Sequence, residues 1–166
     1  MKNPPRLDLG DYVPYLVNRV GSIIADRFGA EALAPHRLSI AMWRVLAALA
    51  ANGSQRQIDV AGLISIDAST LSRLVTRLIR TGLVTRTRSA SSNREVSVTL
   101  SDKGTALVIC LIPIARAYEE AAIAGVSAAD LAIVKRSLRR MYENMKKDDA
   151  VPIERNRPSA SASGLR

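Results

Sequence analysis

Short hydroxyl side chains and arginines recur at helical spacing between residues 69 and 80. The residues are separated by three or four positions and therefore share one face of a helix: Ser69, Ser72, Arg73, Thr76 and Arg80. This face contains no aspartate or glutamate. Small polar side chains let a helix approach a nucleic-acid groove closely, and arginine pairs bidentately with guanine edges or with phosphates. The pattern predicts a helix surface that binds double-stranded DNA.

Two further groups of side chains extend this cationic segment. Thr70 and Arg77 flank the stripe and suit phosphate contacts, which position a protein on DNA without reading its sequence. Arg88, Asn93 and Arg94 lie in or beside a polar loop, and arginines on such a loop can enter a neighbouring minor groove. From Arg73 to Arg94 every charged residue is an arginine.

The elements that must position these residues follow from hydrophobic periodicity. Leu71, Leu74, Val75 and Leu78 occupy the opposite side of the same helix, which we expect to begin at Asp67 or Ser69 and to end at 81–82. A shorter helix should precede it, with Ser54 and Gln57 as a capping box and a tight turn at 65–67. Alternation over 83–88 and 95–100 predicts a two-stranded hairpin, or wing. This order is typical of a winged helix-turn-helix.

Further helices are predicted on both sides of this lobe. We expect them at about 8–33, from Ser39 to 52, at 101–124 and at 127–147. The terminal ones carry more apolar surface than one small domain can cover, so a partner chain is a natural place to bury it. The fold class is therefore mainly α (α+β): a single domain at 1–147, with N- and C-terminal dimerisation helices around a DNA-binding lobe at 39–100. Residues 148–166 are expected to be a disordered tail.

Composition excludes several function classes. The net charge is +9 and the isoelectric point about 10.4, which favours a polyanionic partner. With one histidine, one cysteine and no glycine-rich phosphate loop, we find no set of catalytic residues, so we expect no enzyme, no cofactor and no metal. RNA-specific modules usually carry aromatic stacking platforms, and the basic segment has none. A nonspecific nucleic-acid-binding protein remains an alternative.

The predicted compartment is the cytoplasm, without membrane association. The residues after Met1 lack the apolar core of a signal peptide. The run from 106 to 115 contains Pro113 and is much shorter than the roughly 20 residues of a membrane span. Cys110 lies in this run and is expected to be buried and inert, although a redox-responsive regulator that uses Cys110 is an alternative.

Four segments together resemble one family of proteins. They are 38–46 (LSIAMWRVL), 69–75 (STLSRLV), 80–84 (RTGLV) and 100–104 (LSDKG). In this order they resemble the MarR family of transcriptional regulators, over roughly residues 8 to 147. The resemblance implies an obligate homodimer with interlocked terminal helices. It also implies repression of a nearby operon through a pseudo-palindromic operator, and release from DNA when a small aromatic or phenolic effector binds.

The resemblance also bears on single residues. The family's effector site lies between the dimerisation helices and the DNA-binding lobe, which makes Tyr15, Trp43 and Arg44 candidate ligand contacts. The alternative is that Trp43 is a core residue and Arg44 a surface or interface residue. The family's wing usually carries Asp-x-Arg, whereas this chain has Ser92, Asn93 and Arg94 there. Ser92 cannot form the ion pair that would hold Arg94, so the wing is expected to be less preorganised.

Overall fold

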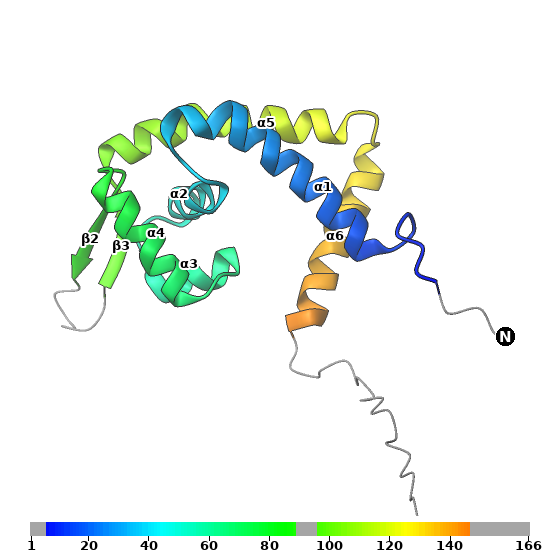
Figure 1. Ribbon diagram of the computed structural model, residues 1–166, viewed down its shortest axis with the longest axis horizontal. Helices are drawn as coiled ribbons and strands as arrows, with labels where there is room; N and C mark the ends of the chain where they lie inside the picture. Colours follow the sequence, from blue (N-terminus) through cyan, green and yellow to red (C-terminus); the bar gives the residue numbers. More distant parts are fainter. Residues whose placement is uncertain (1–5, 89–95, 147–166) are drawn as a thin grey trace, which may run out of the picture. The chain divides into compact units, whose positions relative to one another are not determined.

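A computed structural model describes residues 6–88 and 96–146 of the chain (Figure 1). The chain forms two compact units, Met1–Ala124 and Gly125–Arg166. The predicted tail at 148–166 and the wing residues Ser92, Asn93 and Arg94 lie outside the described residues.

The first unit begins with a helix that is shorter than predicted. Helix α1 spans Val13–Phe28 and continues through a π-helical turn, η1 (Gly29–Leu33), and a 3₁₀ turn, η2 (Ala34–His36). Helix α1 starts at Val13, because Tyr12 before it has an extended backbone. Pro14 lies in the first turn, where proline is tolerated because the N–H group that it lacks would have no partner within the helix. The prediction of a helix from residue 8 was therefore too long by about one turn.

Helix α2 spans Ile40–Asn52 and has the predicted ends. The Ser39 hydroxyl accepts a hydrogen bond from the Met42 amide at 3.2 Å, which satisfies one of the free N–H groups of the first turn. Gly53 follows with a φ of 70°, a conformation that costs glycine little.

The helix-turn-helix and the wing come next. Helices α3 (Gln57–Ile64) and α4 (Ala68–Arg80) are joined by a turn in which Ser65 is left-handed. Strands β2 (Val84–Arg88) and β3 (Val96–Leu100) pair antiparallel, with Val84 opposite Leu100 and Arg88 opposite Val96. The hairpin lies beside α4 (Figure 1). Helix α5 (Asp102–Ile123) then begins at Ser101, whose hydroxyl accepts from the Gly104 amide at 3.0 Å.

The predicted capping box at Ser54 is wrong. Gln55 and Arg56 form a short strand, β1, which pairs with Val98 and Ser97, so the sheet in the described part has the order β1-β3-β2. Helix α3 consequently starts at Gln57, after Arg56 and without a side-chain cap. Pairing with a strand more than 40 residues away along the chain overrides the local capping signal.

The core of this unit lies among α2, α3, α4, the sheet and the adjoining parts of α1 and α5. Its largest completely enclosed side chains are aliphatic: Leu33, Met42, Leu46, Leu49, Leu71, Leu78 and Leu111. No polar or charged residue is buried among the described residues. The winged-helix lobe therefore has a closed apolar core of its own.

Two helices instead expose their apolar stripes. In α1 the exposed apolar residues include Leu16, Val20 and Ile23, while Phe28 is buried at the C-terminal end. In the second unit, α6 (Ala128–Lys146) begins at Ser127, which accepts from the Asp130 amide at 3.1 Å. This helix has no buried residue, and it exposes an apolar seam: Val134, Leu138, Met141 and Met145. None of the helices in residues 6–88 and 96–146 is long and apolar enough to span a bilayer.

Helix α5 corrects the prediction for Cys110. The thiol-bearing residue is exposed, as is its neighbour Ile109 at 65%. Only one side of α5 meets the core, through Gly104, Val108 and Leu111. Because successive helical residues are turned by about 100°, an apolar run in the sequence does not place every member against the core.

Candidate nucleic-acid interface

One face of helix α4 packs in the core, and the opposite face is exposed to solvent. Leu71, Val75 and Leu78 are 0% exposed and Leu74 packs half-buried against them. On the other side, most of the predicted contact residues are exposed and only Thr70 is half-buried: Ser69, Ser72, Arg73, Thr76, Arg77 and Arg80. The division of the helix into a core face and an outer face is the predicted one.

Asp67, not Ser69, caps the N-terminus of α4. Its carboxylate accepts from the Thr70 amide at 2.8 Å and from the Ser69 hydroxyl at 2.6 Å. These hydrogen bonds hold the pKa of Asp67 well below its usual value, and the bond from Ser69 has the largest effect. The hydroxyl proton of Ser69 is committed to this cap, so Ser69 can offer DNA only an accepting oxygen.

Hydrogen bonds within the helix also orient the outer side chains. Arg73 donates from Nη2 to Thr70 Oγ1 at 3.2 Å, and Thr76 donates from Oγ1 to the Ser72 carbonyl at 2.8 Å. The second bond uses the only hydroxyl proton of Thr76. Thr76 is therefore left with an accepting oxygen and a methyl group, the groups that suit an exocyclic amine and a thymine methyl in the major groove.

The C-terminus of α4 is tied to the start of α5. Lys103 Nζ donates to the Thr81 carbonyl at 3.0 Å, and Ser101 Oγ donates to the Gly82 carbonyl at 2.6 Å. A Cβ atom on Gly104 would lie 2.0 Å from the Leu83 carbonyl oxygen, so only glycine fits this contact. The segment 100–104, which the sequence singled out, thus fixes the end of the helix and the base of the wing.

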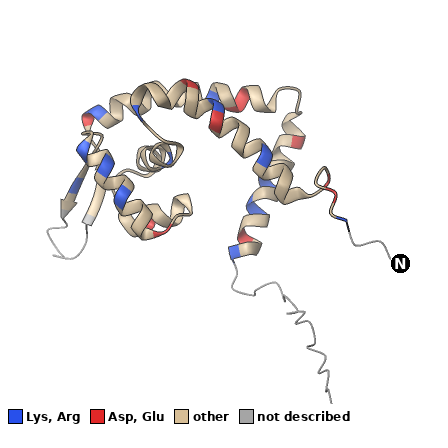
Figure 2. Ribbon diagram, in the orientation of Figure 1, with Lys and Arg blue, Asp and Glu red and all other residues tan. Residues whose placement is uncertain are grey.

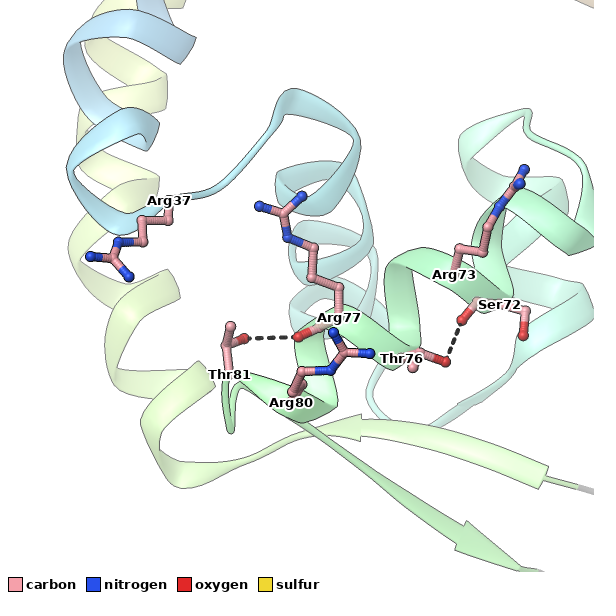
Figure 3. Close-up of a pocket in the computed structure, with 7 residues that line it drawn as sticks. All are labelled: Arg37, Ser72, Arg73, Thr76, Arg77, Arg80 and Thr81. Carbon is pink, nitrogen blue, oxygen red and sulfur yellow. Dashed lines mark hydrogen bonds between the residues drawn. The ribbon is translucent and has the colours of Figure 1, made fainter.

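One open hollow of about 620 Å³ runs along the outer face of α4 (Figure 3). It is lined by residues of the helix and its C-cap, together with one arginine from the turn before α2: Arg37, Ser72, Arg73, Thr76, Arg77, Arg80 and Thr81. None of these arginines forms an ion pair with any residue in the described ranges. Figure 2 shows the cationic side of α4 without acidic residues between Ala68 and Arg80. Arg37 was missed because it belongs to a loop with no periodicity.

The wing is described only at its base. Arg88 ends β2 opposite Val96, at the end of the hairpin away from α5. The other two predicted wing contacts, Asn93 and Arg94, lie outside the described residues.

Comparison with known proteins agrees with this geometry. The sequence model described as "MarR family" matches residues 38–96, which contain α2, β1, α3, α4 and β2. The chain is therefore similar to the MarR family over this part of its length. The similarity is to DNA-binding transcriptional regulators and not to enzymes.

Curated relatives of the chain are named as repressors. The HTH-type transcriptional repressor NicR of Pseudomonas putida is 26% identical over 137 residues, which cover 82% of this chain and 86% of NicR. The HTH-type transcriptional repressor Rv2887 of Mycobacterium tuberculosis is 27% identical over 144 residues, 86% of this chain and all of Rv2887.

Solved structures show the same fold. A MarR family regulator from Silicibacter pomeroyi has a TM-score of 0.76 at 28% identity, covering 88% of this chain and 100% of its own. A structure of BpsR from Bordetella bronchiseptica, whose DNA binding is regulated by 6-hydroxynicotinic acid, has a TM-score of 0.74 at 25% identity, covering 84% and 99%.

The three candidate effector residues do not line one common hollow. Trp43 and Arg44 line a hollow of about 510 Å³ with residues of α3, whereas Tyr15 lines another, of about 570 Å³, with Ile23 and Asp26. Arg44 is exposed, and Trp43 and Tyr15 are half-buried. Within one chain, the structure therefore brings together Trp43 and Arg44 but not Tyr15.

Aromatic packing ties Trp43 to the core. Its ring meets Phe28 edge-on at 5.5 Å, and Phe28 meets Tyr118 of α5 in the same way at 5.6 Å. The Tyr118 hydroxyl donates to Glu31, which raises the pKa of Tyr118 and lowers that of Glu31. The contact with Phe28 agrees with the alternative interpretation, in which Trp43 is a core residue. No cluster of potential metal ligands occurs in the described part of the chain.

Proposed function

We propose that this protein is a homodimeric, ligand-responsive repressor that binds a pseudo-palindromic operator through α4. The observation that carries the proposal is the outer face of α4. It is exposed, cationic and free of carboxylates, while the other face of the same helix is locked in the core. A helix held in this way can enter a major groove without losing its own packing.

Within the face, we assign the residues two roles. Ser69, Ser72, Arg73 and Thr76 belong to the N-terminal two turns of α4, and the N-terminal residues of a recognition helix contact base edges. Thr70 and Arg77 flank the stripe and are assigned to phosphates, and so is Arg80, which belongs to the stripe but ends the helix. Arg88, Asn93 and Arg94 are assigned to the adjacent minor groove, as in the sequence-based prediction.

The exposed apolar stripes of α1 and α6 support a second copy as partner. Each stripe contains large aliphatic residues that are 40% or more exposed, such as Leu16 and Leu138. Stripes of this kind favour burial against another chain, and most homo-oligomers are twofold dimers. Two copies would place two α4 helices on one face of a duplex, with half-sites about one helical turn, or ~34 Å, apart.

Control by an effector rests on the relatives and on the hollow beside Trp43 and Arg44. The structure of BpsR concerns regulation of its DNA binding by 6-hydroxynicotinic acid, and PcaV of Streptomyces coelicolor has been solved with its natural ligand. An aromatic acid would stack on Trp43 and pair its carboxylate with Arg44. The assigned site of action is the cytoplasm, where the protein has access to DNA.

Selection of bound fragments from a random duplex pool tests the DNA-binding proposal. We expect enrichment of a pseudo-palindromic element, and a log–log slope of affinity against salt of about 0.9 per neutralised phosphate. Aromatic carboxylates and phenols should then lower the affinity for that element. Recovery of unrelated fragments with equal affinity would instead favour the nonspecific nucleic-acid-binding alternative.

A further inference from the structure

We propose that Arg37, in the turn before α2, binds a backbone phosphate of the same duplex that α4 contacts. This inference rests on the proposed function of α4 and adds a contact from a different part of the chain. Arg37 lies one residue before the segment that matches the family, 38–96, so the family match does not include it.

The turn holds Arg37 rigidly beside α4. Its amide donates to the Ala34 carbonyl at 2.9 Å, and the next amide, of Leu38, donates to the Leu33 carbonyl at 3.1 Å. Leu33 and Leu38 are both buried in the core. The backbone of Arg37 is thus fixed on both sides, while its side chain is exposed.

The backbone conformation does not explain why an arginine stands here. Arg37 has a φ of 55°, in the left-handed region that glycine and asparagine adopt most easily. The turn would form as well or better with either of those residues. The side chain therefore calls for a role outside the turn, because strained residues of this kind concentrate at functional sites.

The surroundings of the side chain point to an anion. Arg37 lines the same hollow as Arg77, Arg80 and Thr81 at the C-terminal end of α4 (Figure 3). It has no acidic partner among the described residues, and no carboxylate lines the hollow. Like charges gathered without a counter-ion repel one another, and a phosphate group removes that repulsion.

The position favours a phosphate over a base edge. Base contacts come mainly from the N-terminal part of a recognition helix, whereas Figure 3 shows Arg37 on the side of Arg77 and Thr81, away from Arg73. A cation at this border of the groove meets the sugar-phosphate backbone first. The contact would add affinity for every duplex sequence alike.

Replacing Arg37 with asparagine gives a sharp test, because Arg37→Asn removes the charge and suits the left-handed turn. We expect the affinity to fall by roughly 5- to 30-fold for the operator and a random duplex alike. The log–log salt slope should fall by about 0.9 for each Arg37 that contacts the duplex, or about 1.8 per dimer. Melting temperature should be unchanged or higher. Arg37→Lys should retain most of the salt slope.

The matched control is Arg116→Gln, which removes an exposed arginine from α5 and leaves the outer face of α4 intact. If Arg37→Asn changed affinity and slope no more than Arg116→Gln, the loss would reflect net charge and the inference would be overturned. A loss confined to the operator would also overturn it, by making Arg37 a base contact. Wild-type affinity in Arg37→Asn beside weak binding in Arg73→Ala would refute only this inference. Absence of DNA binding by the wild-type protein would refute both proposals.

Discussion

The winged-helix lobe buries an apolar core, whereas helices α1 and α6 expose apolar stripes. In the lobe, Leu71, Val75 and Leu78 of α4 are completely buried, and the polar face of the same helix is outside. In α6 no residue is buried, and the apolar seam itself is outside. The lobe is complete as a folded unit, whereas the terminal helices have an apolar surface that one chain leaves uncovered. The difference separates the proposed DNA-binding part from the part proposed to form the dimer.

The largest expected effect comes from charging the α6 seam. Leu138, 40% exposed, should lie in the proposed dimer interface, so Leu138→Glu should yield monomers in sedimentation or light scattering. Because a dimer gains from binding two half-sites at once, operator affinity should fall by roughly 10²- to 10⁴-fold. Arg136→Glu places the same carboxylate on the other side of α6 and should leave the dimer intact. A dimeric Leu138→Glu would break the comparison.

Substitutions of two leucines, one buried and one exposed, test whether the winged-helix lobe has a closely packed core. Leu71→Ala empties space in the core and should lower the free energy of unfolding by about 2–5 kcal/mol. Leu63→Ala, the same substitution at a residue that is 55% exposed, should change it by less than about 0.5 kcal/mol. Chemical denaturation of the two variants measures both values, and similar losses would show that the lobe is not packed as described.

Substitutions of two arginines on α4 test the division between residues that contact bases and residues that contact phosphates. Arg73→Ala should weaken operator binding by roughly 5- to 150-fold and relax base preference, while binding to random duplex changes less. Arg77→Ala should weaken both duplexes by one common factor and lower the salt slope. Titrations of both variants on both duplexes decide the matter; identical profiles would contradict the two roles.

The smallest expected effect concerns the cap of α4. The pKa of Asp67 is depressed in the folded protein, so its carboxylate stabilises the fold above the unfolded pKa, and this contribution is lost as pH falls through the folded value. The melting temperature of Asp67→Ala should therefore lie below that of wild type by a constant amount above about pH 5, a difference that shrinks below pH 3.8. Asp67→Asn retains the accepting oxygen and should lose less. A pH-independent difference would assign the loss to something other than the carboxylate.

Local signals in the sequence predicted much of this structure. Ser39 and Ser101 cap the expected helices because a capping bond spans only three residues, and Gly82 has the expected positive φ of 73° after α4. The outer face of α4 followed from spacing alone, because its opposite face is so strongly apolar.

Some of the misses involve contacts between distant segments, and others, such as the start of α1 and the exposure of Cys110, are local. Ser54 failed as a cap because β1 pairs with β3, and Cys110 was placed in the core because its sequence neighbours are apolar. Arg37 reaches the α4 hollow only through the path of the turn after η2. Spacing along one element cannot encode which loop comes to lie beside it. Tyr15 and Trp43 illustrate the same limit, since they line separate hollows within one chain.

Site-directed cleavage of DNA tests the placement of α4 most directly. Because Cys110 is the only cysteine, an iron chelate can be attached at Ala68, the exposed first residue of α4, in an Ala68→Cys, Cys110→Ser variant. On the selected operator, we predict two cleavage centres in the major groove about one helical turn apart. The same chelate on Cys110 of the wild-type protein should give neither centre. Diffuse cleavage from position 68, or cleavage no different from that of the Cys110 conjugate, would contradict the account.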